Sequence, residues 1–272
     1  MDIKAFKMDG LGNDFLIIDR RKKSISIKKE KIIELGKREN IGFDQLIFID
    51  EIDNGTPNYN PITIYNSDGE KVEACGNGSR CVAKILCDQE KKEEAVIITS
   101  NRILKAQKIS ENSIRLEMGK PIFEWQKIPL SRDINHKNIN IKINDLEFRD
   151  GFAINVGNPH IVFFVDDCFK YDLKKIGPLI ENYELFPEKI NVTFAQIKDS
   201  SNILVNVWER GAGLTKACGT AACATGVVAF EKKLSGNNTN IHFKEGLLNI
   251  KYNSVISMTG PVSDIKEIEV KL

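Results

Sequence analysis

Hydrophobic residues along the chain fall into short runs separated by polar and turn-forming residues. Four of these runs are bounded by Gly, Asn, Asp or Pro, which is typical of strands. They are Phe15–Ile18, Leu46–Ile49, Val96–Ile98 and Ile161–Val165. Helical periodicity is clearest in four other segments, Lys28–Arg38, Gly78–Cys87, Tyr171–Glu181 and Ala221–Leu234. The pattern predicts an α+β fold in which strands outnumber helices.

One short sequence block occurs twice, each time where a predicted helix begins. Ala74-Cys75-Gly76 in the first half is matched by Ala217-Cys218-Gly219 in the second. Other features precede each block in the same order: a Gly-Asn turn, an amide in a strand, and a polar residue nine positions before the cysteine. These are Asn13, Gln45 and Asn66 in the first half, and Asn158, Asn191 and Glu209 in the second. The order predicts two similar domains with a site between them.

Length and charge narrow the classes of partner. The chain has 272 residues, enough for two domains, and its 39 basic and 38 acidic residues give a formal charge of +1. No overall field favours nucleic acid or an anionic membrane, so we expect a small-molecule ligand. The segment Met1–Gly10 lacks the apolar core of a signal peptide, and no run is long enough to span a membrane. We therefore expect a cytoplasmic protein whose six cysteines are reduced.

The two cysteines have a setting that suits proton transfer at the α-carbon of an amino acid. A glycine after each cysteine allows close approach of a ligand, and the first N–H groups of the following helix are available to a carboxylate. The helix dipole also favours the thiolate of Cys75 or Cys218. One cysteine removing a proton and the other donating one to the opposite face would invert the centre.

Other interpretations of the cysteines and of the chain were weighed. A single cysteine at such a junction is most often a packing residue, but the duplication favours chemistry, whereas Cys81, Cys87, Cys168 and Cys223 are expected to pack. The cysteine spacings do not suit zinc, and no metal is expected. No nucleotide-binding motif is complete; a pyridoxal lysine stays open, although two thiols would make that cofactor unnecessary. A disulfide between Cys75 and Cys218 on air oxidation also stays open.

Charged residues near the repeats suggest how a substrate is held. His160 follows the second Gly-Asn turn and is a candidate supporting residue near a thiol. Glu209-Arg210 stands where the first half has Asn66-Ser67, so the repeat is asymmetric there. A guanidinium fits a carboxylate and a carboxylate fits an ammonium, so this pair suits a second amino-acid end. As an alternative, adjacent opposite charges are often a solvated strand end.

Taken together, these segments resemble the diaminopimelate epimerase family. The resemblance rests on Met8–Phe15, Gly42–Gln45, Ala74–Gly78, Gly157–His160, Trp208–Gly213 and Ala217–Thr220, which span nearly the whole chain in order. Two departures are Leu214, where many relatives carry Glu, and Ala221-Ala222 in place of Gly-Ala. Neither removes an expected contact. The nearest rival is a proline racemase-like enzyme of the same two-thiol fold, and a non-catalytic thiol or metal-binding protein is a rival from another class.

The resemblance implies a homodimeric, cofactor-independent isomerase that interconverts LL- and meso-diaminopimelate, on the route to lysine and cell-wall precursors. It implies two pseudo-symmetric domains, each a mostly antiparallel, barrel-like sheet around a central helix, with the site in the cleft between them. We expect residues 1–118 with a C-terminal strand at 264–272 in one domain, and residues 119–263 in the other. Cys75 and Cys218 would be the acid-base thiols, with His160 and Glu209 assisting proton movement. Substrate contacts would come from Asn13, Gln45, Asn66, Gly76, Asn77, Asn158, Asn191, Glu209, Arg210, Gly219 and Thr220.

Overall fold

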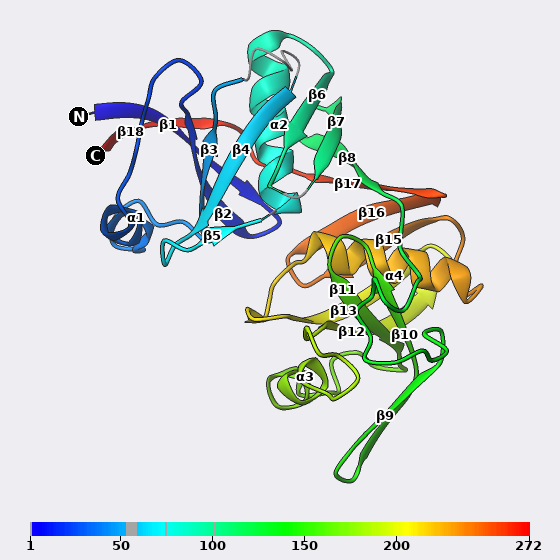
Figure 1. The fold of residues 1–272 in the computed structure, drawn as a ribbon. Coiled ribbons are helices and arrows are strands. Elements are labelled where there is room, and N and C mark those ends of the chain that lie inside the picture. Colours follow the sequence, from blue (N-terminus) through cyan, green and yellow to red (C-terminus); the bar gives the residue numbers. More distant parts are fainter. Residues whose placement is uncertain (1, 53–58, 74, 101) are drawn as a thin grey trace. The chain divides into compact units, whose positions relative to one another are not determined.

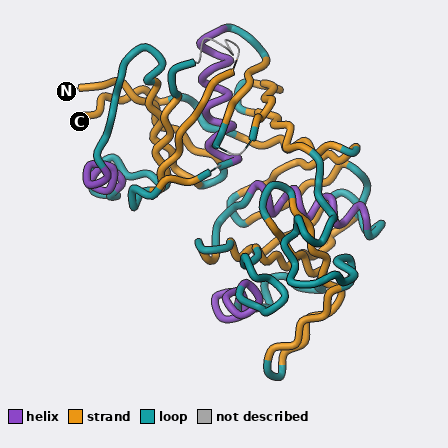
Figure 2. Tube along the Cα trace, in the orientation of Figure 1, coloured by secondary structure: helices purple, strands orange, loops and turns teal. Residues whose placement is uncertain are grey.

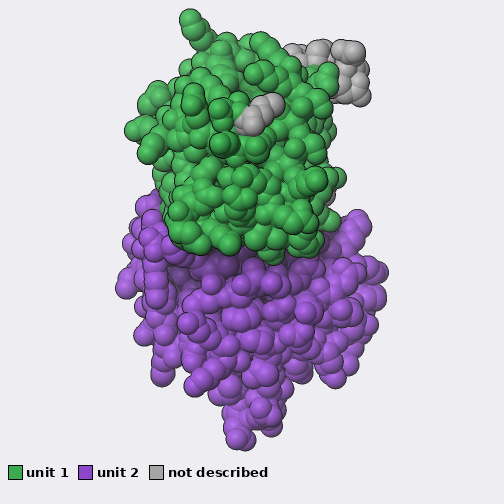
Figure 3. All heavy atoms as spheres, turned by 90° about the vertical axis from the view of Figure 1, so that its left-hand side faces the viewer, with its two compact units in different colours: residues 1–117, 259–272 green, residues 118–258 purple. Residues whose placement is uncertain are grey.

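The computed structural model describes residues 2–52, 59–73, 75–100 and 102–272. The chain divides into two compact units, which Figure 3 shows in two colours: residues 1–117 with 259–272, and residues 118–258. The chain leaves the first unit within strand β8 (Ser113–Gly119) and returns to it within β17 (Val255–Pro261). Strands outnumber helices in both units (Figure 2), as the sequence pattern predicts.

Unit 1 is a set of strands around one buried helix, α2 (Figure 1). Strands β1 and β2 form an antiparallel hairpin, β3 runs parallel to β2, and β4 runs antiparallel to β3. After α2, β6 runs parallel to β4 and is followed by the antiparallel strands β7 and β8, while β18 pairs with β1. The elements are β1 (Asp2–Gly10), β2 (Asn13–Asp19), α1 (Lys29–Gly36), β3 (Gln45–Ile49), β4 (Tyr59–Asn66), β5 (Lys71–Val72), α2 (Gly76–Glu90), β6 (Glu94–Ile98), β7 (Ile103–Ser110), β8 and β18 (Lys266–Lys271).

Unit 2 repeats this order of elements around helix α4. Strands β10 and β11 form the hairpin, β12 runs parallel to β11, β13 runs antiparallel to β12, and β15 runs parallel to β13. Strand β9 pairs with β10 as β18 pairs with β1. The elements are β9 (Ile139–Ile143), β10 (Leu146–Asn155), β11 (Pro159–Phe164), α3 (Leu173–Glu181), β12 (Asn191–Asp199), β13 (Asn202–Glu209), β14 (Gly213–Leu214), α4 (Gly219–Glu231), β15 (Asn238–Phe243), β16 (Gly246–Asn253) and the first part of β17.

The central helices are buried on all sides, which explains their composition. Every residue of α2 from Asn77 to Cys87 is buried, and every residue of α4 from Ala221 to Ala229 is buried. A helix with no solvent face needs apolar or small residues all round, as α4 has, or polar residues with partners, as Arg80 and Lys84 of α2 have in Asn77 and Glu111. Glycines allow the closest approach to the surrounding strands: a Cβ on Gly226 would lie 2.8 Å from Ile250 Cγ2. Each central helix is therefore fixed in position by backbone-level packing.

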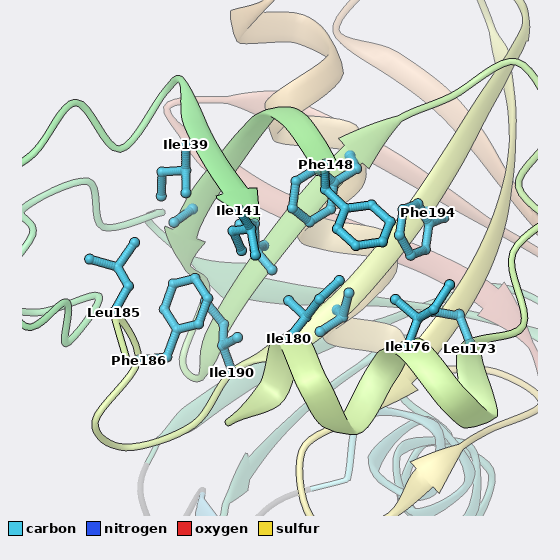
Figure 4. Close-up of a cluster of buried hydrophobic side chains, with 14 of the residues drawn as sticks. Ile139, Ile141, Phe148, Leu173, Ile176, Ile180, Leu185, Phe186, Ile190 and Phe194 are labelled. Atoms are coloured by element: carbon cyan, nitrogen blue, oxygen red, sulfur yellow. The ribbon is translucent and has the colours of Figure 1, made fainter. Parts of the chain in front are cut away.

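Helices α1 and α3 have one apolar face and cover the outside of their sheets. In unit 2, Leu173, Ile176 and Ile180 of α3 point toward Phe148 and Phe194 on the strands (Figure 4). In unit 1, α1 contributes its buried side chains to a cluster with residues of β2 and β3. None of the helices in the described ranges is long and apolar enough to cross a membrane.

The four predicted helices and four predicted strands are confirmed, with ends that coincide or differ by up to three residues. The polar segment 119–150, near whose start the sequence placed a domain boundary, is part of unit 2. It contains β9, whose Ile139 and Ile141 are buried in the same apolar cluster as α3. Alternation of isoleucine with Asn and Lys marks this strand, although its composition is polar overall.

Candidate functional site

Cys75 is the N-cap residue of α2 and lies at the positive end of that helix. Its backbone is extended, with φ −146° and ψ 111°, and its side chain is partly exposed. The Gly78 backbone N–H donates to Cys75 Sγ over 3.4 Å. A helix N-terminus with an N–H directed at sulfur stabilises negative charge on the thiol group. Ala74, the first residue of the repeated block, lies outside the described residues.

The first turn of α2 offers backbone donors beside this thiol. Gly76 and Asn77 are its first two residues, so their N–H groups have no acceptor one turn earlier in the helix. The Asn77 side chain is buried, and its Oδ1 accepts a hydrogen bond from Arg80 Nη2 at 2.9 Å. Asn77 therefore presents its backbone, with its side chain held by the helix itself.

The three amides predicted in the first half lie at neighbouring strand ends. Asn13 begins β2, Gln45 begins the adjacent parallel strand β3, and Asn66 ends the antiparallel strand β4. Gln45 pairs with Asn66 across the strands, and Gln45 Nε2 donates to Asn66 Oδ1 at 3.0 Å. Gln45 Oε1 is buried and has no hydrogen-bond partner among the described residues. This acceptor is therefore unsatisfied, which is unusual for a buried oxygen.

The corresponding residues of unit 2 occupy the same positions in the strands. Phe15, two residues after Asn13, pairs with Gln45, and His160, two residues after Asn158, pairs with Asn191. Asn191 is buried. Its Nδ2 donates to the Pro159 carbonyl at 2.7 Å, and its Oδ1 accepts from the Arg210 backbone N–H at 2.9 Å. Asn191 thus joins the start of β11 to the end of β13.

His160 is fully buried and bonded to its neighbour in the Gly-Asn turn. Its Nε2 lies 2.9 Å from Asn158 Oδ1. With this oxygen as acceptor, the ring proton is on Nε2 and Nδ1 carries a lone pair. Within the described residues, Nδ1 has no hydrogen-bond partner. Burial, together with the charge of Arg210, lowers the pKa of His160 to about 3, so the ring is neutral at ordinary pH.

Cys218 is the N-cap residue of α4, in the same backbone conformation as Cys75. Its φ is −136° and its ψ is 114°, but its side chain is only 5% exposed. Its Sγ lies 3.4 Å from Thr220 Oγ1, and the Glu209 carboxylate is near enough to act on the thiol electrostatically. The structure therefore places three predicted site residues of unit 2 close together.

The pKa of Cys218 and that of Glu209 are both raised. Burial raises the pKa of Cys218 well above its usual value, and the negative charge of Glu209 raises it further, while the Thr220 hydroxyl acts in the opposite direction. Burial also raises the pKa of Glu209, an effect that the neighbouring Thr215 and Cys218 side chains reduce. At rest the thiol of Cys218 therefore keeps its proton, and the nearby carboxylate is a base that can receive it.

The two thiols thus have the same backbone setting but different side-chain partners. Cys75 Sγ accepts a backbone N–H, whereas the Cys218 thiol contacts a carboxylate and a hydroxyl. Arg210, next to Glu209, is exposed, and its Nη1 donates to the Glu188 carbonyl at 2.9 Å. The asymmetry that the sequence places at Glu209-Arg210 is therefore also an asymmetry in how each sulfur is supported.

Sequence reasoning missed several residues that support these positions. Asp44 Oδ2 accepts the Asp14 N–H at 2.9 Å, and the Asp44 carbonyl accepts the Ser67 N–H at 3.0 Å. The Arg38 guanidinium donates hydrogen bonds to the side-chain carboxylates of Asp14 and Asp44. These contacts hold the strand ends that carry Gln45 and Asn66. Asp44 adjoins Gln45 in the chain, which was the available signal. Thr215, three residues before Cys218, was missed as well.

The remaining cysteines lie in the interior. Cys81, Cys87, Cys168 and Cys223 are all buried. Burial raises the pKa of Cys87 and of Cys168 to about 11, and it raises that of Cys81 further. In the ranges that the structure describes, no three His, Cys, Asp or Glu side chains come together as a metal site would require. The raised pKa keeps the thiols of Cys81, Cys87 and Cys168 protonated at neutral pH.

Comparisons with known proteins agree on one family. The diaminopimelate epimerase family model matches residues 5–124 and 152–265. A diaminopimelate epimerase of Pelagibacter ubique (strain HTCC1062) is 50% identical over 277 residues, covering 100% of both chains. Another, from a Wolbachia of Drosophila simulans (strain wRi), is 39% identical over 259 residues, covering 94% of this chain and 95% of its own.

Solved structures with the same fold are more distant in sequence. A hydroxyproline epimerase from Agrobacterium vitis has a TM-score of 0.68 at 11% identity, covering 99% of this chain and 92% of its own. A PhzF-family phenazine biosynthesis protein from Enterococcus faecalis has a TM-score of 0.68 at 13% identity, covering 100% of both chains. At these identities the likeness concerns the fold alone.

Proposed function

The chain belongs to the diaminopimelate epimerase family, and from this membership we propose that it interconverts LL- and meso-diaminopimelate by proton transfer at one α-carbon. The reaction is an isomerisation. It needs one base to remove the α-proton and one acid to return a proton to the opposite face. The proposed product serves lysine and cell-wall precursor synthesis. The proposal uses no cofactor.

We propose Cys75 and Cys218 as the two acid-base groups. In one direction the thiolate of one cysteine takes the α-proton as the C–H bond breaks. The thiol of the other then gives its proton to the carbanion, and becomes a thiolate. The observation that supports this most is that each cysteine is the N-cap of a buried central helix, in units that repeat the same strand register. Two matched chemical groups suit a reaction in which the forward and reverse directions remove the proton from opposite faces of the same carbon.

The first helical turns would hold the reacting carboxylate. The N–H groups of Gly76, Asn77, Gly219 and Thr220 belong to helix N-termini, which carry partial positive charge. Charge that develops on the carboxylate during proton removal is stabilised by such fixed donors. Both helices are fixed by packing, so the donors need no rearrangement during the reaction.

Glu209 and His160 would assist the movement of protons. Glu209 is near the Cys218 thiol, so it can take the thiol proton and leave Cys218 as the thiolate that acts as the base. His160 is neutral and has a buried Nδ1 lone pair, so it can accept a hydrogen bond but does not carry a positive charge. We propose both as assisting residues, with the cysteines as the groups that exchange protons with carbon.

The distal end of the substrate would be read by polar and charged side chains. We propose Asn13, Gln45 and Asn66 from unit 1 and Asn158, Asn191, Glu209 and Arg210 from unit 2. Diaminopimelate has a second ammonium and a second carboxylate, whereas a cyclic imino acid has neither. The exposed guanidinium of Arg210 suits the second carboxylate. These contacts would discriminate against proline.

A homodimer and a cytoplasmic location are also proposed, on the strength of the family resemblance. Size-exclusion chromatography with light scattering should give twice the mass of the 30.6 kDa chain. A mass equal to one chain at micromolar concentration would contradict the dimer.

The substrate is tested directly with the reduced, purified protein. LL-diaminopimelate, L-proline and trans-4-hydroxy-L-proline are incubated separately, and the stereoisomers are separated by chiral chromatography. We expect conversion of diaminopimelate to the meso form, with no conversion of the two cyclic compounds. Equal turnover of proline would favour the proline racemase-like alternative, and no turnover of diaminopimelate would refute the proposal.

A further inference from the structure

Glu181, the last residue of α3, is a buried carboxylate that lies outside the site described above. It is 5% exposed. A buried carboxylate is costly unless it is hydrogen-bonded and paired with a cation. Both of its oxygens are used, and both bonds go to the segment that carries Glu209 and Arg210.

The bonds of Glu181 are made to residues on either side of that pair. Its Oε2 accepts the Trp208 Nε1–H at 2.6 Å, and its Oε1 accepts the Gly211 backbone N–H at 3.1 Å. Lys189 Nζ lies 3.8 Å from Oε1 and supplies the neighbouring positive charge. Glu209 and Arg210 are the two residues between these anchor points in the chain. One side chain of α3 therefore fixes the end of β13 and the start of the following turn.

Helix α3 also packs directly against the Trp208 ring. Gly177 precedes Glu181 by four residues, so both lie on one face of the helix. A Cβ on Gly177 would lie 2.4 Å from Trp208 Cδ2, so only glycine fits there. Trp208 and Glu209 are consecutive in a strand, and consecutive side chains point to opposite faces. Holding Trp208 against α3 therefore directs Glu209 to the other face of the strand, where its charge acts on the Cys218 thiol.

The connection after α3 holds Arg210 as well. The Glu188 carbonyl accepts from Arg210 Nη1, and Asn191, at the start of β12, accepts from the Arg210 backbone N–H. Glu209 and Arg210, the two residues at which the sequence repeat differs between the units, are thus held in position by α3 and the segment that follows it.

We propose that Glu181 is a positioning residue, which fixes the segment Trp208–Gly211 so that Glu209 stays against Cys218 and Arg210 stays directed at the substrate. It does not touch the reacting atoms. The inference rests on the proposed function for its effect on turnover, but its effect on the Cys218 thiol needs no substrate.

The main test is Glu181→Gln. The glutamine amide has nearly the same shape as the carboxylate, but it has one acceptor oxygen and one NH2 group. Either the Trp208 Nε1–H or the Gly211 N–H would then face a donor in place of an acceptor. The test uses kcat/KM for diaminopimelate and the pH dependence of Cys218 alkylation by iodoacetamide, followed by peptide mass spectrometry. We expect kcat/KM to fall about 10- to 100-fold, in line with a displaced catalytic group. We also expect Cys218 to react at lower pH, because Glu209 no longer lies against it.

Three further variants make the result specific. Glu184→Gln removes an exposed carboxylate from the same connection and should match the wild type. Glu181→Asp keeps the charge and should restore part of the activity. Trp208→Phe keeps the ring against Gly177 but removes one donor, so it should have a smaller effect than Glu181→Gln. It also tests the proposal if Glu181→Gln does not fold.

The outcomes separate this proposal from the proposed function. If folded Glu181→Gln, or Trp208→Phe in its place, keeps the wild-type kcat/KM and the wild-type pH profile of Cys218, the positioning role is refuted. A lower melting temperature with an unchanged profile would also refute it, because that is a structural role only. If the wild type does not turn over diaminopimelate, the proposed function fails, while the alkylation profile still tests the position of Glu209.

Discussion

Gly78 in the first turn of α2 offers a test of how packing sets the position of the Cys75 thiol. A Cβ added there would lie 2.5 Å from Ile47 Cδ1 and 3.2 Å from Phe15 Cε1. Ile47 and Phe15 are both 0% exposed, so neither can move into solvent. The Gly78 N–H is also the donor to Cys75 Sγ. Because both side chains are enclosed in the core, we expect the helix to shift in Gly78→Ala, and the thiol to shift with it.

The size of the effect follows from two opposing contributions. Inserting a methyl group into a packed core costs about 1 to 3 kcal/mol, and the contact with Ile47 places this case in the upper part of that range. Replacing glycine by alanine in a helix returns up to about 1 kcal/mol. We expect a net loss of about 1 to 2 kcal/mol in the free energy of unfolding of unit 1. A displacement of the thiol by about 1 Å should lower kcat/KM about 100-fold.

The assay combines urea unfolding, followed by circular dichroism, with epimerisation kinetics. Gly236→Ala is the matched control, because a Cβ there meets nothing within 4 Å and the residue is exposed. This control should lie within about 0.5 kcal/mol of the wild type and keep its activity. The reasoning is refuted if Gly78→Ala matches Gly236→Ala in both stability and kcat/KM.

Three other predictions concern ionisable groups of unit 2. Glu209→Gln removes the negative charge that raises the pKa of Cys218, so alkylation of Cys218 should begin at lower pH. The epimerisation rate should fall about 10²- to 10⁴-fold, and an unchanged rate would contradict the role of Glu209. Thr220→Val removes a hydroxyl that lowers the pKa of Cys218, so alkylation should move to higher pH, and a shift in the opposite direction would be inconsistent with the observed contact. The folded pKa of His160, about 3, lies below the unfolded value, so protonation favours the unfolded state and stability falls as the pH drops below about 6.5. His160→Gln should lose less stability than the wild type between pH 7 and pH 5 in urea unfolding, and equal losses would contradict this linkage.

Much of the fold could be predicted because local pattern and tertiary structure agree. The helices that begin at Cys75 and Cys218 were located from periodicity and the adjacent glycines, and both cysteines are N-caps. The order of amides before each cysteine corresponds to equivalent strand positions in the two units. The spacing of residues within one half of the chain was sufficient for these predictions, because most residues of each unit are contiguous in the sequence.

What could not be predicted depends on contacts between distant residues. The proximity of Glu209 to the Cys218 thiol depends on how β13 and the turn after it meet α4, which no local pattern specifies. Glu181 is 27 residues from Trp208 in the chain, and a lone acidic residue at a helix end is usually solvated. The strand Ile139–Ile143 was obscured by its polar neighbours, although its isoleucines alternate. Burial, which the sequence does not state, decides each of these cases.

The central claim is that two thiols act on one α-carbon. LL-diaminopimelate is incubated in deuterated water with the reduced wild type and with Cys75→Ala and Cys218→Ala, and the α-deuterium content and configuration of the product are measured. We predict that the wild type gives meso product carrying α-deuterium, and that epimerisation falls about 10²- to 10⁴-fold in each variant. Full epimerisation by either single variant would contradict the two-thiol mechanism.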